Sequence, residues 1–175
     1  MVEVDETYIG GREKNKHYNK KLRSGRGSVG KVPVVGIRSR DGRVKAYVIK
    51  SADGKTLTST IRGNVSRGAT VYTDQFRAYS GLKEFTHRKV NHDTGEYVRE
   101  SIHTNSIESF WAILKRGYHG IYHKWSEKHL QRYANEFAIR YNMRYCSPME
   151  RISSAITGGY NKHLPYKELI NAKAC

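Results

Sequence analysis

The chain has 175 residues, enough for one domain with a substantial hydrophobic core. Its 32 Lys and Arg residues against 16 Asp and Glu residues give a net charge of +16 at pH 7, which favours a polyanionic partner, nucleic acid ahead of an anionic membrane. The sequence lacks an apolar run of about 18 residues and a leader pattern, which argues against a membrane span and a signal peptide. Cys146 and Cys175 have no CxxC spacing, which fits a reducing compartment and predicts no zinc site.

The first third of the chain predicts three consecutive antiparallel strands. VEVDETYI (2–9) is a strand interrupted by acids, with Val2, Val4 and Glu6 expected on one face and Glu3, Asp5 and Thr7 on the other. VPVVGIRS (32–39) and VKAYVIK (44–50) follow as a hairpin, joined by a turn over 40–43.

The segment between the first two strands is strongly basic. Residues 12–31 hold eight Lys or Arg residues against one Glu, and no apolar residue recurs at a regular spacing. It is interpreted as a flexible insertion, either a solvated loop or an arm laid against phosphates. The residues expected to bind DNA there are Arg12, Lys14, Lys16, Lys20, Lys21, Arg23, Arg26 and Lys31.

The middle of the chain alternates between helix and strand. Leu57, Ile61 and Val65 recur every four residues, as on the buried face of a helix. The predicted elements are a helix of about 10 residues ending near Gly63, a strand over 68–74, a helical turn over 75–82, a strand over 85–90 and a polar loop over 92–100.

The last third predicts helices. One runs over 104–116 and is stopped by Gly117, and a second runs over 127–143 with Ser126 as its cap. A third begins at Ser147-Pro148-Met149-Glu150, which combines a Ser cap, Pro in the first helical position and Glu in the third, and ends at 158–159.

This order predicts an α/β fold in a single domain over 1–175. Three antiparallel strands followed by alternating helix and strand are typical of the RNase H-like fold, a mixed five-stranded sheet flanked by helices, here with extra C-terminal helices. The match is an analogy until the chemistry supports it.

Two acids fall at positions where that fold would bring them together. Asp5 lies in the middle of the first strand, where it either faces water from a sheet edge or holds a metal ion. Asp74 closes the fourth strand, where it is either the N-cap of the next helix or a ligand. Because the first and fourth strands are neighbours in an RNase H-like sheet, we expect Asp5 and Asp74 to meet.

The helix over 104–116 offers a third acid. Its apolar arc is Ile107, Phe110, Trp111 and Leu114, and its polar arc is Asn105, Glu108, Ala112 and Lys115. With the apolar arc on the sheet, Glu108 can approach the two aspartates, although an ordinary exposed face has the same spacing. Three gathered carboxylates repel unless cations neutralise them, and oxygen ligands suit Mg²⁺ or Mn²⁺. Two such ions about 4 Å apart support phosphoryl transfer.

At these residues the sequence resembles a known family. VDETYIGG, VYTDQFRAY and HTNSIESFWAILKRGYHGIYHKWSEKHLQRYANEFAIRYN are similar to DDE transposases of bacterial insertion sequences, in the group of prokaryotic relatives of Merlin transposons. The resemblance implies that Asp5, Asp74 and Glu108 hold two Mg²⁺ ions. It also implies that Lys115, seven residues after Glu108, contacts DNA together with Arg116. Some members have Asn in the third catalytic place, which makes Asn105 the alternative to Glu108.

The resemblance implies an activity as well. Such enzymes cut DNA at the element end and join the freed 3′-hydroxyl to a target, without a covalent enzyme intermediate. They work as dimers or higher multimers on DNA in the bacterial cytoplasm, at the nucleoid. Relatives usually carry an N-terminal zinc-ribbon or helical DNA-reading module, which this chain is expected to lack, either as an excised catalytic domain or as the product of a truncated element.

Two other functions stay open at this point. One is an RNase H-like metal-dependent nuclease or junction resolvase, and the other is a catalytically inactive DNA-binding module derived from a transposase. A further stretch, RGYHGIYHKWS, is rich in aromatic and basic residues and is interpreted either as a stacking platform for an unpaired base or as core packing. Its residues are Tyr118, His119, Tyr122, His123 and Trp125.

Overall fold

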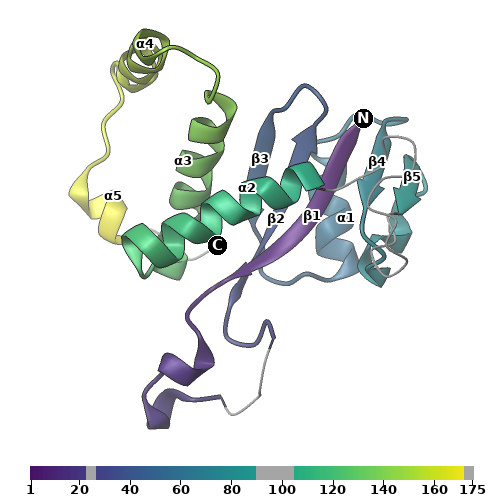
Figure 1. The fold of residues 1–175 in the computed structure, drawn as a ribbon, viewed down its shortest axis with the longest axis horizontal. Coiled ribbons are helices and arrows are strands. Elements are labelled where there is room, and N and C mark those ends of the chain that lie inside the picture. Colours follow the sequence, from purple (N-terminus) through teal and green to yellow (C-terminus); the bar gives the residue numbers. More distant parts are fainter. Residues whose placement is uncertain (23–26, 90–104, 172–175) are drawn as a thin grey trace.

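A five-stranded mixed sheet forms the centre of the computed structural model, which describes residues 1–22, 27–89 and 105–171 (Figure 1). The strand order is β3-β2-β1-β4-β5, with β2 antiparallel to both β1 and β3, and with β4 parallel to both β1 and β5. The predicted neighbourhood of the first and fourth strands is confirmed. The strands are β1 (Val2–Ile9), β2 (Val32–Ser39), β3 (Val44–Val48), β4 (Thr70–Thr73) and β5 (Thr86–Lys89).

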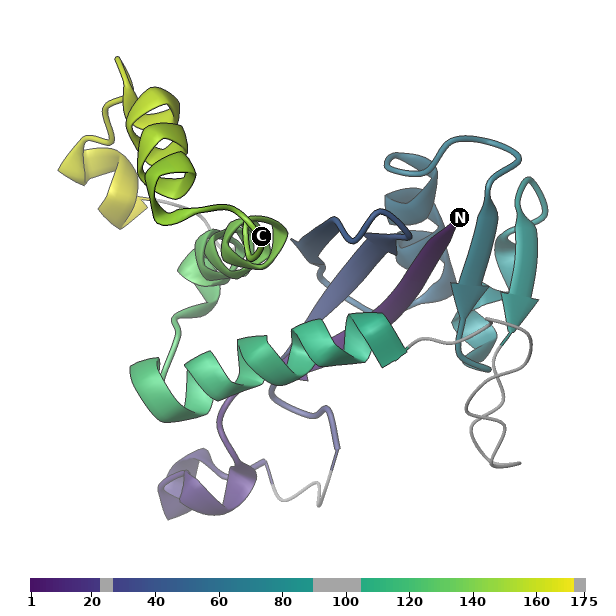
Figure 2. The same ribbon diagram turned by 45° about the horizontal axis from the view of Figure 1, so that its top comes forward.

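Helices cover both faces of this sheet. Helix α1 (Gly54–Arg62) lies on one face, and α2 (Asn105–Arg116) crosses the opposite face, as Figures 1 and 2 show. Helix α3 (Leu130–Asn142) lies on the same side as α2, against β3. Each face therefore has its own hydrophobic core. The loop predicted over 92–100 lies outside the described residues.

The core under α1 follows the predicted periodicity. Leu57 and Ile61 are fully buried, and they pack with Val4 and Val35 of the sheet. The helix begins at an Asp53 N-cap, whose carboxylate accepts a hydrogen bond from the backbone of the third helical residue. This core also contains the 3₁₀ turn Arg77–Gly81, which is the helical turn expected after the fourth strand.

The core under α2 depends on one glycine of the sheet. The predicted apolar arc of α2 is buried. Trp111 lies so close to β2 that a Cβ atom on Gly36 would be 2.6 Å from its ring, a distance that real Cβ contacts do not reach. A glycine at position 36 therefore allows the helix to approach the sheet at this point.

The chain after α2 differs from the prediction in two ways. Helix α2 ends at Arg116 as predicted, but the chain continues from Gly117 as a π-helical turn, Gly117–Tyr122. Gly117 gives room to the ring of Phe137, which a Cβ would approach to 2.1 Å. The next helix, α3, starts at Leu130 and not at 127, because 127–129 form a 3₁₀ turn in which Ser126 makes no side-chain cap bond.

The basic arm and the C-terminal part of the chain also contain helical elements. The basic arm, defined as residues 12–31, contains two 3₁₀ turns in its described part, Glu13–Asn15 and Tyr18–Lys20, where an irregular insertion was predicted. Toward the C-terminus, α4 (Pro148–Gly159) has the predicted capping box and is followed by α5 (Tyr166–Asn171). Neither α4 nor α5 has a buried residue, and both stand away from the sheet (Figure 1). No helix within the described ranges is both long and apolar enough to cross a bilayer.

Candidate active site

The acids of β1 are divided between the two faces of the sheet, as the alternation predicted. Asp5 faces α2, where its Oδ2 accepts a hydrogen bond from Trp111 Nε1 at 2.9 Å. Glu6 faces the other core, where its carboxylate accepts a hydrogen bond from the hydroxyl of buried Tyr79. Each carboxylate therefore has one aromatic donor from a distant part of the chain.

Asp74 lies directly after β4, the strand next to β1. Its Oδ1 accepts a hydrogen bond from the backbone of Phe76 at 3.0 Å, so the side chain holds a tight turn two residues long. It is not the N-cap of the following 3₁₀ turn, whose cap residue is Phe76. The side chain is half-buried, and its charge acts on both acids of β1.

Burial and neighbouring negative charge raise the pKa of both acids of β1. Burial raises the pKa of Asp5 to about 7, and the negative charges of Glu6 and Asp74 add to the rise, while the hydrogen bond from Trp111 opposes it. Burial also raises the pKa of Glu6, and the charge of Asp74 acts in the same direction. Burial, followed by the charge of Glu6, raises the pKa of Tyr79, which keeps this phenol a donor.

A fourth acid, Glu3, ties α2 to the strand. It is only 1% exposed, and its Oε2 accepts a hydrogen bond from the backbone N–H of Ile107 at 3.1 Å, in the first turn of α2. A carboxylate at a helix N-terminus is stabilised by the helix dipole. Its Oε1 lies 3.5 Å from Arg38 Nη1. Sequence reasoning assigned no role to Glu3, although its place two residues before Asp5 on the same face was visible.

Glu108 follows Ile107 directly, so its backbone lies beside the anchored start of α2. Its side chain is exposed, one turn before Trp111. Lys115 and Arg116 are exposed in the last turn, and seven residues of helix separate Lys115 from Glu108 by about 10 Å. Asn105 is the first residue of α2, and its side chain lies outside the described part of the structure.

A divalent cation fits the chemistry of the Asp5–Asp74 pair. Both groups offer oxygen ligands, and burial together with the charges of Glu6 and Asp74 raises the pKa of Asp5, so a hard cation there would stabilise its ionised form. Among the described residues, no group of three His, Cys, Asp or Glu side chains is close enough together to hold a metal ion. The charges of both Asp74 and Glu6 act on Asp5, and Glu6 is an acid that was not predicted to do so.

The predicted DNA-binding residues differ in exposure and in their contacts. In the basic arm Arg12, Lys14, Lys20 and Lys21 are exposed, and Lys16 forms an ion pair with Glu13 at 2.7 Å. Lys31 is half-buried at the start of β2, and Arg23 and Arg26 lie outside the described residues.

The aromatic residues of the 118–125 stretch are mainly core residues. Tyr118 and Trp125 are 5% and 7% exposed, and Trp125 stacks on Tyr133 with 4.9 Å between ring centroids. Tyr122 is half-buried and packs against Trp125, while His119 and His123 are exposed. Core packing, one of the two interpretations of this stretch, is confirmed for these rings.

Comparison with proteins of known sequence and structure agrees with this fold. The catalytic core domain of BIV integrase covers 91% of this chain and 97% of its own length with a TM-score of 0.53, at 12% identity, which shows a shared fold. The sheet with its flanking helices is thus RNase H-like, as predicted.

Sequence comparison shows the family. An uncharacterized protein in transposable element ISH50 of Halobacterium salinarum is 34% identical over 128 residues, which are 66% of this chain and 43% of that protein. The chain therefore spans less than half the length of this relative. The model of the ISXO2-like transposase domain matches residues 1–142, which include β1, β4 and α2 with all the candidate catalytic residues. The chain belongs to the ISXO2-like transposase domain family.

Proposed function

We propose that this chain is the catalytic domain of a DDE transposase that cuts DNA at the end of an insertion sequence and transfers the freed strand. The observation that carries the proposal is the pair formed by Asp5 in β1 and Asp74 directly after β4, two acids on neighbouring parallel strands. Burial raises the pKa of Asp5, and the charges of Glu6 and Asp74 add to the rise. Such a pair is suited to divalent cations and a phosphodiester substrate.

The residues have distinct proposed roles. Asp5 and Asp74 would hold Mg²⁺ or Mn²⁺, with two ions in the complete site and no zinc. Glu108 is the proposed third ligand, since its helix is joined to β1 through Glu3 and Ile107 one residue earlier. Asn105, at the start of the same helix, is the alternative. When bound, the ions activate the attacking oxygen and stabilise the leaving one.

The DNA is proposed to lie along the positive surface. The exposed cations of the basic arm, beyond the end of β1, would neutralise backbone phosphates, and Lys115 and Arg116 would do so at the far end of α2. Two copies of the chain on two DNA ends, in the bacterial cytoplasm at the nucleoid, complete this proposal. Binding that uses several phosphates should weaken steeply as the salt concentration rises.

A cleavage and strand-transfer assay with a DNA end and Mn²⁺ tests the function. The wild type should give transfer products, and Asp5→Asn, Asp74→Asn and Glu108→Gln should lose them while remaining folded. Glu136→Gln is the matched control, because Glu136 is an exposed acid on α3 that pairs with Arg140. Cleavage without transfer would instead indicate a nuclease or resolvase, and binding without chemistry an inactive DNA-binding module.

A further inference from the structure

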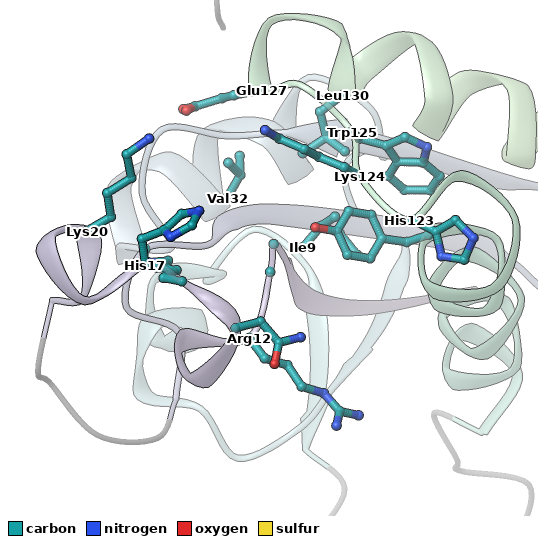
Figure 3. A pocket seen from close by; sticks show the side chains of 16 residues that line it. Ile9, Arg12, His17, Lys20, Val32, His123, Lys124, Trp125, Glu127 and Leu130 are labelled. Carbon is teal, nitrogen blue, oxygen red and sulfur yellow. The ribbon is translucent and has the colours of Figure 1, made fainter.

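A cavity of about 620 Å³ lies beyond the end of β1, between the basic arm and the segment that connects α2 to α3 (Figure 3). Its lining includes the apolar side chains of Ile9, Val32 and Leu130, together with the rings of Tyr118 and Trp125. This volume is within the range of pockets that bind small organic molecules, and it is far larger than a phosphate group requires.

Positive charge surrounds the apolar part of the cavity. Arg12, Lys16 and Lys20 line it from the basic arm, and Lys124 from the other side, against the single carboxylate of Glu127. In Figure 3 the side chain of Lys20 comes from the arm and that of Lys124 from the opposite segment. An apolar interior with a cationic lining suits a ligand that has both a flat organic ring and an anionic group.

Trp125 forms part of the cavity wall. The residue lines the cavity and is 7% exposed, and its Nε1 is buried, with no hydrogen-bond partner within the described residues. Its indole therefore contributes apolar surface, and no hydrogen bond, to the cavity.

The cavity lies near the acids of β1. Ile9 follows Asp5 by four residues of extended strand, which is about 13 Å. DNA rises about 3.4 Å per nucleotide along one strand of a duplex. A DNA strand that passes Asp5 along the direction of β1 therefore reaches the cavity about four nucleotides away.

We infer that this cavity binds one unpaired nucleotide of the DNA strand, with its phosphate at the Lys and Arg side chains and its base against the apolar lining. An intact duplex would place only phosphates at this surface and leave the apolar part without a partner. The inference rests on the proposed action on DNA and adds to it a site that selects an unpaired nucleotide about four nucleotides from the cut.

A glycine allows the cavity to be narrowed without a change in charge. Gly11 lines the cavity, and a Cβ atom placed on it would meet no atom within 4 Å. Gly11→Leu should therefore occupy cavity space while the fold and net charge stay the same. Gly120→Leu is the matched control, because Gly120 also has open space around its Cβ position and does not line the cavity.

The binding test uses fluorescence anisotropy at fixed salt with three DNA probes. They are a blunt duplex, the same duplex with a short single-stranded tail, and a tailed duplex whose tail is abasic. We expect wild type and Gly120→Leu to bind the tailed duplex roughly tenfold more tightly than the other two probes, the size expected for one base contacting an aromatic lining. Gly11→Leu should bind all three probes equally, with unchanged blunt-duplex affinity.

Three results would overturn the inference. Equal affinity of wild type for the tailed and abasic probes would mean that the cavity binds phosphate alone. A tail preference that survives in Gly11→Leu would place the unpaired nucleotide elsewhere. If an acidic peptide removes the tail preference of wild type, and Gly11→Leu keeps its tail preference, the cavity would instead bind a protein ligand. Each of these leaves duplex binding and Mn²⁺-dependent cleavage intact, whereas failure of the proposed function removes cleavage itself.

Discussion

Trp111 and Asp5 are joined across the interface between α2 and β1, since the indole Nε1 donates to the carboxylate at 2.9 Å. The ring of Trp111 reaches this position over Gly36, the register partner of Asp5 on β2. The same side chain is thus part of the hydrophobic core and the hydrogen-bond donor to the candidate metal ligand. Packing of α2 therefore supplies the hydrogen bond that opposes the rise in the pKa of Asp5.

Trp111→Phe should raise the pKa of Asp5 further above about 7, because the lost hydrogen bond favours the ionised form. The measurement is an NMR titration of the carboxyl carbon of Asp5. Phe110→Leu, which alters the same core without touching a polar group of Asp5, should leave this titration in place. An equal shift in both variants would mean that core volume, and not the hydrogen bond, controls Asp5.

The stability of the metal-free protein should fall as the pH rises from about 4 to about 7. The folded-state pKa of Asp5 lies above its ordinary value of 3.8, so the contribution of Asp5 to stability is fully present below pH 4 and is lost as the carboxyl ionises in the fold. Asp5→Asn removes this loss and should be more stable than wild type at pH 8 by roughly 2–4 kcal/mol. Urea unfolding at pH 4 and pH 8 measures the difference.

Asp41→Asn is the control for that experiment. Asp41 is fully exposed, and hydrogen bonds from Ser39 and the backbone of Arg43 lower its pKa, so its charge favours folding where that of Asp5 opposes it. Replacement of Asp41 should therefore not stabilise the protein at pH 8. If Asp5→Asn exceeds wild type in free energy of unfolding by the same amount at pH 4 and at pH 8, the electrostatic explanation is contradicted.

Gly36→Ala should destabilise the protein by about 1–3 kcal/mol, because the added methyl group forces Trp111 and Ile107 away from the sheet. Thermal unfolding measures the loss, and the pKa of Asp5 should change with it, since the donor moves. Gly158→Ala provides the comparison, because nothing lies within 4 Å of its Cβ position. Equal stability of the two variants would show that α2 has room to shift.

Glu3→Ala should lower the free energy of unfolding by about 2–4 kcal/mol, because it leaves the N–H of Ile107 and the largely buried Arg38 without their acceptor. Glu3→Gln keeps an acceptor for Ile107 and should lose less. Hydrogen exchange at Ile107 reports the effect directly, and it should become faster in Glu3→Ala than in Glu3→Gln. Unchanged exchange at Ile107 in both variants would mean that α2 does not depend on this contact.

Local patterns were sufficient for most of the elements. The bounds of β1 and β2, the buried arc of α2 and the capping box of α4 follow from alternation, helical spacing and residue type within a few positions of one another. The π-helical turn after Gly117 was not predicted. There the ring of Phe137, twenty residues later, occupies the space that a Cβ atom on residue 117 would need.

The candidate site could be proposed only in part. Asp5 and Asp74 stand on strands that an RNase H-like order makes neighbours, so the sequence was sufficient to propose them. Glu6 was not, because its role comes from Tyr79, which is 73 residues away, and the donor of Asp5 is 106 residues away.

The sequence by itself determined most of the strands and helices, the excess of positive charge and the positions of the two aspartates along the strands, since each depends on residues that are neighbours in the chain. Only the tertiary structure decided which donors the acids receive, how far burial raises the pKa of Asp5, and where the basic arm and the 118–130 segment enclose a cavity. These features depend on the distance and the solvent between groups that are far apart in sequence. That information exists only once the chain has packed.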